Sequence, residues 1–343
     1  MKLKYITLAI IPLFVINIFS ELSAQTLSKF SPSDDMSYGL KKLSKKPKKI
    51  YIAAFNINFE VYKEAIDYKK GGAGFGGNVK GEATARGAIG LTGLDQAKIQ
   101  EKTDQLYKEF IESLKAEEFE IVDPALAGAT EIYKGWEKAT GPYVIESPLP
   151  GLMVSVPSGY SFYYSGKEGP LANLNAAQKL SSELDDAAVA TVNLYFMYSE
   201  DGDSWLPSNG AEVKMLTNYR LAGEYMVRAP KEKGLKGSES FDKISSMIKV
   251  VQGKMGAGAE IQYQGSLKEA LEIEGIIKKE KMVVYSKQSS ATTTSFTPVV
   301  IAGPSYAKDT KWVDVDPAKY AEGLYHAGHK FLTYHLTEYT SNY

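Results

Sequence analysis

The stretch KKIYIAAFNINF, residues 48–59, is the first strong β-strand signal in the chain. Its first half is continuously apolar, which is typical of a strand that is covered on both faces. Its second half alternates, with Phe55, Ile57 and Phe59 set against asparagines. This period of two predicts a strand over residues 50–61.

Two later segments have the period of an amphipathic helix. Over residues 97–116 the apolar side chains recur every three or four residues, and Asp95 is in the position of an N-cap. Residues 317–339 form the second segment, with Asp316 as N-cap and Pro317 at the first helical position. The buried stripe expected for this second helix is Tyr320, Leu324, Ala327, Phe331 and Tyr334.

The remaining signals complete an alternating pattern of strands and helices. A shorter helix is predicted through Leu174, Ala177, Leu180 and Leu184, and strands are predicted at 119–122, 188–198, 212–221 and 259–267. The sequence therefore predicts one main α/β domain over residues 49–340, a mixed sheet flanked by helices. Long β-rich excursions are expected near 63–95, 125–170, 229–258 and 280–312.

The N-terminal residues have the three-part pattern of a secretory signal peptide. Lys2 and Lys4 precede an apolar run of about fifteen residues, which is short for a spanning helix. Small residues follow at Ser23 and Ala24, so cleavage is expected before Gln25. We therefore predict export to the periplasm, the outer membrane or the outside of the cell; a retained N-terminal anchor is the alternative. Residues 25–48, with six lysines, are interpreted as a linker.

The amino-acid composition excludes several classes of functional site. The chain has 343 residues, 40 Lys+Arg, 41 Asp+Glu and no cysteine, so its net charge is −1. A thiolate metal site, a disulfide framework and a cysteine nucleophile are excluded. Nothing in this charge balance attracts nucleic acid. No cofactor is predicted; the expected partner is a protein or a second copy of this chain, and membrane contact is an option.

Three stretches together resemble a known family. They are KKIYIAAFNINF (48–59), DQLYKEFIESLKAEEFEIVDP (104–124) and AAQKLSSELDDAAVATVNLYFMY (176–198). Their order is similar to the α/β domain of the curli-pore lipoprotein (CsgG-like) and penicillin-binding-protein-activator group, over about residues 48–265. The resemblance implies a scaffold, pore or activator without catalytic residues. Members are typically lipidated on a cysteine, which this chain does not have.

All three histidines lie in the last predicted helix. At 100° per residue, His326 and His329 are about 60° apart, and Glu322 precedes His326 by one turn. These three side chains are the candidate ligands of a metal ion and the basis for an alternative function, a secreted metal-dependent hydrolase. His335 points away from them, and packed or solvent-facing histidines are the other interpretation.

The glycine-rich residues 71–77 contain G-x-G-x-x-G, but a β period follows where a dinucleotide site requires a helix. Residues 78–94 alternate small or apolar side chains with polar ones. Val79, Ala83, Ala85, Ile89 and Leu91 mark a β-hairpin excursion, which supports a third function, a component of an oligomeric β-barrel pore. A packed surface hairpin is the alternative.

Tyrosine and proline gather in the excursion over residues 141–166. Tyr143, Tyr160, Tyr163 and Tyr164 are the candidates for a binding surface, because exposed tyrosine is common in interfaces. Tyrosine used as amphipathic cover explains the same pattern. From the sequence, the function we expect first is an exported, non-enzymatic cell-envelope scaffold or binding protein, with self-assembly as a further expectation.

Overall fold

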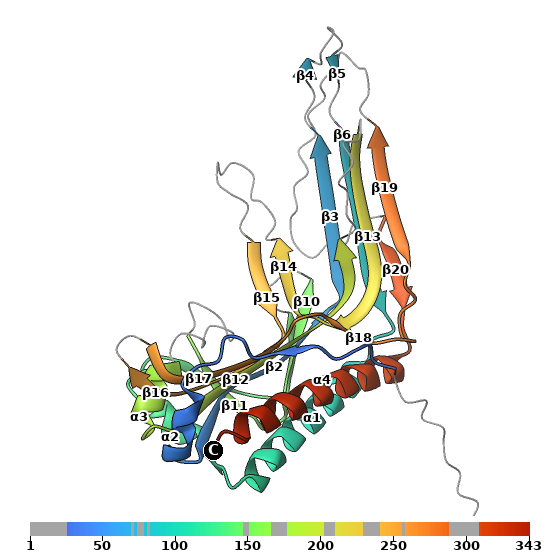
Figure 1. Cartoon of the computed structure of the whole chain (residues 1–343). Coiled ribbons are helices and arrows are strands. Elements are labelled where there is room, and N and C mark those ends of the chain that lie inside the picture. Colours follow the sequence, from blue (N-terminus) through green and yellow to red (C-terminus); the bar gives the residue numbers. More distant parts are fainter. Residues whose placement is uncertain are drawn as a thin grey trace, which may run out of the picture.

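The computed structural model of the chain is shown in Figure 1. It describes residues 26–69, 72–73, 79–80, 83–146, 151–165, 177–201, 210–228, 241–255, 258–287 and 309–343. The predicted signal peptide and its cleavage site lie outside these residues.

A mixed sheet forms the centre of the molecule, which confirms the predicted α/β fold. Its two middle strands, β2 (Lys49–Glu60) and β12 (Ala188–Asp201), run parallel, with Ile57 opposite Leu194. In the described residues the sheet has eleven strands, and its main path is β1-β17-β16-β12-β2-β10-β9. The other strands on this path are β1 (Pro32–Ser33), β17 (Gly258–Leu267), β16 (Met247–Met255), β10 (Leu152–Val156) and β9 (Tyr143–Glu146).

The remaining strands of this sheet lie off its main path. β7 (Glu120–Ile121) runs parallel to the start of β2. β13 (Gly210–Leu221) is antiparallel to β12 and also pairs with β18 (Leu271–Glu272) and β19 (Lys281–Lys287).

Two long helices cover one face of the sheet (Figure 1). They are α1 (Gln96–Ala116) and α4 (Pro317–Thr340), and both begin where the sequence predicts. Asp95 caps α1, since its Oδ1 accepts from the backbone N–H of Ala97 at 2.9 Å. Asp316 caps α4 through Ala318 in the same way, at 2.9 Å. Each cap satisfies a donor that has no partner within its helix.

The opposite face carries two short helices, α2 (Pro124–Gly128) and α3 (Ala177–Glu183). Neighbouring residues of β2 alternate between the two faces. Ile50 and Ile52 belong to the core shared with α1 and α4, whereas Tyr51 packs in a separate cluster with Leu180 of α3. We call this sheet together with its helices the body.

The buried stripe of α4 differs from the prediction at its end. Tyr320, Leu324, Ala327 and Phe331 are buried, but Tyr334 is 40% exposed and packs edge to face against Phe30, with ring centroids 5.3 Å apart. The stripe advances by four residues after Phe331, so His335 enters the core in its place.

Residues 26–48 are tied to the body, so the expectation of a linker is wrong in this respect. Leu27 bridges to Ile273, β1 pairs with β17, and Tyr38 bridges to Gln262. The segment thus runs along the edge of the sheet at β17 and then forms the 3-10 helix η1 (Leu40–Lys45). Covering an open sheet edge removes unpaired N–H and C=O groups that would otherwise recruit other chains.

The lysines of this segment are partly neutralised. Lys46 lies 2.9 Å from both Asp186 and Glu260, and Lys42 lies 3.2 Å from Glu260. These contacts raise the pKa of Lys46, chiefly through its hydrogen bond to Glu260. The segment therefore presents less free positive charge than its sequence indicates.

The excursion at 63–95 is a hairpin. β3 (Tyr62–Lys69) pairs antiparallel with β6 (Ala83–Thr92), and β4 (Gly72–Ala73) pairs with β5 (Val79–Lys80) in the same register. Of the glycine-rich residues 71–77, only Gly72 and Ala73 are among the described residues. β20 (Lys311–Asp314) runs parallel along the other side of β6.

The sheet β20-β6-β3 packs against β13 and β19 as a second layer. Together these strands rise from the body as a narrow two-layer structure (Figure 1). We call it the projection. The described strands of the excursions predicted at 63–95 and 280–312 thus lie side by side in one structural unit.

The other two excursions are only partly separate from the body. Over 125–170, β8 (Glu137–Thr140) and β11 (Ser161–Tyr164) form a small sheet, but β9 and β10 extend the central one. In the excursion at 229–258, β15 (Phe241–Ser245) pairs antiparallel with β14 (Glu224–Arg228), which lies just before it in the chain. Placing β16 in this excursion is wrong, because it is an inner strand. Ile248 and Val251 face different clusters, so β16 lacks the alternation of a half-exposed strand.

Candidate functional site

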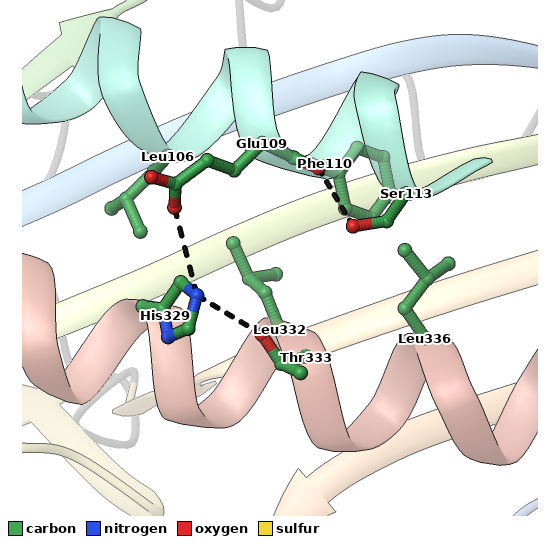
Figure 2. A pocket seen from close by; sticks show the side chains of 8 residues that line it. All are labelled: Leu106, Glu109, Phe110, Ser113, His329, Leu332, Thr333 and Leu336. Carbon is green, nitrogen blue, oxygen red and sulfur yellow. Dashed lines mark hydrogen bonds and ion pairs between the residues drawn. The ribbon is translucent and has the colours of Figure 1, made fainter. Parts of the chain in front are cut away.

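Of the three histidines, His329 lies at the contact between α1 and α4 (Figure 2). His329 of α4 faces Glu109 of α1, with Nε2 3.7 Å from Oε2. Tyr325 donates to the same carboxylate at 2.9 Å and 3.1 Å. Burial and this hydrogen bond raise the pKa of Tyr325 to about 12. Glu109 therefore joins the two helices.

The three predicted metal ligands do not converge. Glu322 Oε2 lies 3.7 Å from His326 Nε2, but its other oxygen lies 2.7 Å from Lys102 Nζ of α1. His329 turns to Glu109 instead of to this pair. Among the residues that the structure describes, no three His, Asp or Glu side chains are grouped as metal ligands.

The cavity beside these side chains is small (Figure 2). Its volume is about 30 Å³, far below the roughly 300–1,000 Å³ of typical ligand pockets. It does not accommodate an organic substrate. The lining residues are Leu106, Glu109, Phe110, Ser113, His329, Leu332, Thr333 and Leu336.

The third histidine is a buried structural residue. The Nε2 of His335 lies 3.0 Å from the carbonyl oxygen of Ser266, which can only accept, so Nε2 carries the hydrogen. Nδ1 then accepts from the hydroxyl of Tyr263 at 2.8 Å. Burial lowers the pKa of His335 to about 4. The neutral ring thus links α4 to β17.

The four candidate tyrosines do not form an exposed surface. Tyr160 is 3% exposed and donates to the carbonyl oxygen of Ile52 at 3.1 Å. Tyr163 is 9% exposed and stacks on Tyr133, with centroids 4.7 Å apart. Tyr164 donates to Glu137 at 2.9 Å, which leaves Tyr143 as the one largely exposed member. The rings of Tyr160 and Tyr163 therefore pack against the body and are not available as a binding surface.

The candidate hairpin residues point into the projection. Ala83, Ala85, Ile89 and Leu91 are between 1% and 7% exposed. The Cα of Gly87, on the same side, faces Val213 and Met215 of β13 and Met282 of β19. The small residues of β6 therefore allow two layers to approach closely. The side chain of Val79 is not among those described; its backbone pairs with Ala73.

A buried carboxylate lies where the body meets the projection, and sequence reasoning missed it. Glu60, at the end of β2, is 3% exposed. It accepts from the backbone N–H groups of Tyr198 and Ser199 at 3.0 Å and 2.9 Å and from the Ser199 hydroxyl at 2.7 Å. At this point the pairing of β12 with β13 shifts register. Glu60 therefore satisfies donors that the irregular pairing leaves free.

Arg220 of β13 completes this junction. Its guanidinium donates to the carbonyl oxygens of Asn218 and Ser199, each at 2.8 Å, and contacts Glu200 at 3.1 Å. Burial raises the pKa of Glu60, while the charge of Lys63, the hydrogen bonds from Ser199 and Tyr198 and the charge of Arg220 oppose that shift. The signal in the sequence was a glutamate that continues the polar positions Asn56 and Asn58 of a strand whose first half is apolar on both faces.

Comparison with known proteins adds no relative. No protein-family model matches the sequence, and neither the curated proteins nor the solved structures give a match. Within the part of the chain that the structure describes, none of the helices has the length and apolar character needed to cross a membrane.

Proposed function

We propose that this chain is an exported cell-envelope protein that acts as a non-enzymatic scaffold or binding protein and uses the projection to assemble with itself or with a protein partner. The observation that carries this proposal is the projection itself. It is a two-layer β-structure that extends beyond the helix-covered body (Figure 1). The resemblance to CsgG-like proteins supports the same class, and the N-terminal sequence pattern supports export.

Exposed apolar side chains give the projection a contact surface. Val283 on β19 is 48% exposed and Trp312 on β20 is 45% exposed. The ring of Trp312 lies over Gly90 of β6 and shields its backbone. Contiguous exposed apolar surface marks protein contacts, and these two residues are the large exposed apolar side chains of the projection among those described.

The pore alternative receives less support from this hairpin. The apolar side chains of β6 are covered by β13 and β19 in the single chain. Exposing them to lipid would require the two layers to separate. We therefore favour contact through the outer surfaces of the projection.

Sedimentation of residues 25–343, with and without detergent, tests this proposal. We expect a concentration-dependent oligomer that Val283→Asp dissociates. Leu126→Asp is the matched control, because Leu126 is 62% exposed on α2 of the body. A strict monomer in both conditions, or equal effects of the two substitutions, contradicts self-assembly. Capture of a partner that Val283→Asp abolishes and Leu126→Asp preserves then supports the binding form of the proposal.

A further inference from the structure

A row of polar side chains crosses the face of the sheet opposite α1 and α4. Lys249 of β16 is paired in register with Thr191 of β12 on one side and with Gln264 of β17 on the other. Ile248 and Val250 belong to the core with α4, so Lys249 points to the other face. Directly opposite residues have Cβ atoms about 4.5–5.5 Å apart, so these three side chains are neighbours.

One member of the row has a buried polar group without a hydrogen-bond partner, and a second is a partly buried cation. Thr191 is 2% exposed, and its hydroxyl makes no hydrogen bond. Lys249 is partly buried, which lowers its pKa. Among the described residues, none makes a hydrogen bond or ion pair with its ammonium group. A buried hydroxyl without a partner is destabilising, so its position beside a partly buried ammonium group requires an explanation.

The charges around the row leave Lys249 uncompensated. Glu260 of β17 is engaged by Lys42 and Lys46, and Asp186 is engaged by Lys46. In the next row, Asn56 donates to the side-chain oxygen of Asn193 at 2.9 Å. Among the side chains that the structure describes, this face therefore combines a cation that makes no ion pair with neutral hydrogen-bonding groups, which is the chemistry that binds an anion.

We propose that Thr191, Lys249 and Gln264 form a binding site for an oxyanion group, a carboxylate or a phosphate, of a small ligand. Lys249 supplies the charge, and the Thr191 hydroxyl and the Gln264 amide supply hydrogen bonds. The site lies on the body, so it is independent of assembly through the projection.

The first test is a titration of residues 25–343 with orthophosphate and, separately, with acetate, followed by NMR of the lysine side chains. We expect saturable binding, with the tighter of the two anions identifying the preferred group. Binding also raises the pKa of Lys249, because the anion stabilises the charged form. Absence of saturable binding of both anions overturns the proposal.

Substitutions of Lys249 separate a site from general attraction of anions. Lys249→Met weakens binding at least tenfold, and Lys249→Arg retains most of it. The folded state tolerates Lys249→Met, because methionine replaces a partly buried cation that has no partner. Lys41→Met is the matched control, since Lys41 is exposed in η1. Equal losses for Lys249→Met and Lys41→Met overturn the proposal.

Thr191→Val tests whether the Thr191 hydroxyl binds a ligand or is only a buried hydroxyl without a partner. Both interpretations expect a more stable protein, because valine removes a buried polar group without changing shape. Only the proposed site also expects weaker anion binding, by about threefold to tenfold. A gain in thermal stability with unchanged affinity overturns the site.

Discussion

The body and the projection bury apolar surface in different ways. In the body, large side chains such as Phe55, Phe196 and Phe331 are fully buried between the sheet and two long helices. In the projection, Ala85 and Gly87 of β6 face Val213 and Met215 across two thin β layers. Buried area per residue is smaller where the side chains are small. The projection therefore depends more on its base and on the body than the body depends on it.

The largest expected effect comes from the junction between the two regions. Glu60→Ala removes the acceptor of three hydrogen bonds and leaves the backbone donors of Tyr198 and Ser199 buried. We expect a loss of about 3–5 kcal/mol in the free energy of unfolding, as for other broken buried charge networks. Urea unfolding measures this loss.

Glu112→Ala is the control for that substitution, because Glu112 is exposed on α1. Hydrogen exchange then locates the damage. Loss of protection at β6 and β13 before β2 supports a junction that holds the projection. If the free energy of unfolding of Glu60→Ala equals that of the wild type, the Glu60 hydrogen bonds do not stabilise the junction.

The next effect concerns the body alone and depends on pH. His335 has a pKa of about 4 in the folded state, against 6.5 for the unperturbed side chain. The unfolded chain therefore binds the additional proton between these values, and stability falls as the pH drops from about 6.5 to about 4. The expected loss is about 3 kcal/mol, since one pKa unit corresponds to about 1.36 kcal/mol.

Unfolding free energies measured at several pH values test this. His335→Gln removes most of the pH-dependent loss over that interval, whereas the double variant His326→Gln and His329→Gln keeps it. The ring lies against Tyr263 and the Ser266 carbonyl, with Asp34 as the nearby charge. A wild-type protein with flat stability over this interval contradicts the buried neutral ring.

Two glycines compare the stiffness of the regions directly. A Cβ added at Gly87 of the projection lies 2.9 Å from the terminal methyl of Met215, 3.0 Å from Cγ1 of Val213 and 3.2 Å from the terminal methyl of Met282. The two methionine methyls are the flexible ends of their side chains, whereas the branched valine must give by a few tenths of an ångström. A Cβ added at Gly265 of the body lies 2.3 Å from His335 Nδ1, on a ring held by two hydrogen bonds.

We therefore expect Gly87→Ala to change the unfolding free energy by less than about 1 kcal/mol and Gly265→Ala to reduce it by about 2–3 kcal/mol. Thermal unfolding of the two variants under the same conditions provides the comparison. If the order is reversed, the projection is the more rigid of the two regions.

The same contrast explains which features could be predicted from the sequence. The helices α1 and α4, their caps and the central strands β2 and β12 follow from local periodicity and composition. The hairpin β3–β6 shows a β period, but whether β6 faces lipid or another layer depends on β13 and β19, far along the chain. β16 was missed because Lys249 is the one polar residue among Met247 to Val251, which is too short a pattern to show alternation.

The candidate sites show the same limit. His326 and His329 lie on one helix, as predicted. Their contacts could not be predicted, because Lys102, which binds the candidate ligand Glu322, and Glu109, which pairs with His329, both belong to α1. Glu60 and Lys249 were missed because each is a single charged residue in a strand. The partners of Glu60 lie more than a hundred residues further along the chain, at Tyr198 and Ser199. Lys249 lies opposite Gln264 only because β16 pairs with β17.

The smallest expected effect is at the α1–α4 contact. His329 and Glu109 are 47% and 32% exposed, and their 3.7 Å contact is an ordinary surface pair. Such pairs contribute about 0–1 kcal/mol, so the double variant His326→Gln and His329→Gln keeps its unfolding free energy within about 0.5 kcal/mol. Zinc sharpens the comparison, because a metal bound only by the folded state at 100 times its Kd stabilises by about 2.7 kcal/mol. We expect no zinc-dependent rise in the melting temperature of either protein; a rise in the wild type that the double variant abolishes reinstates the metal site.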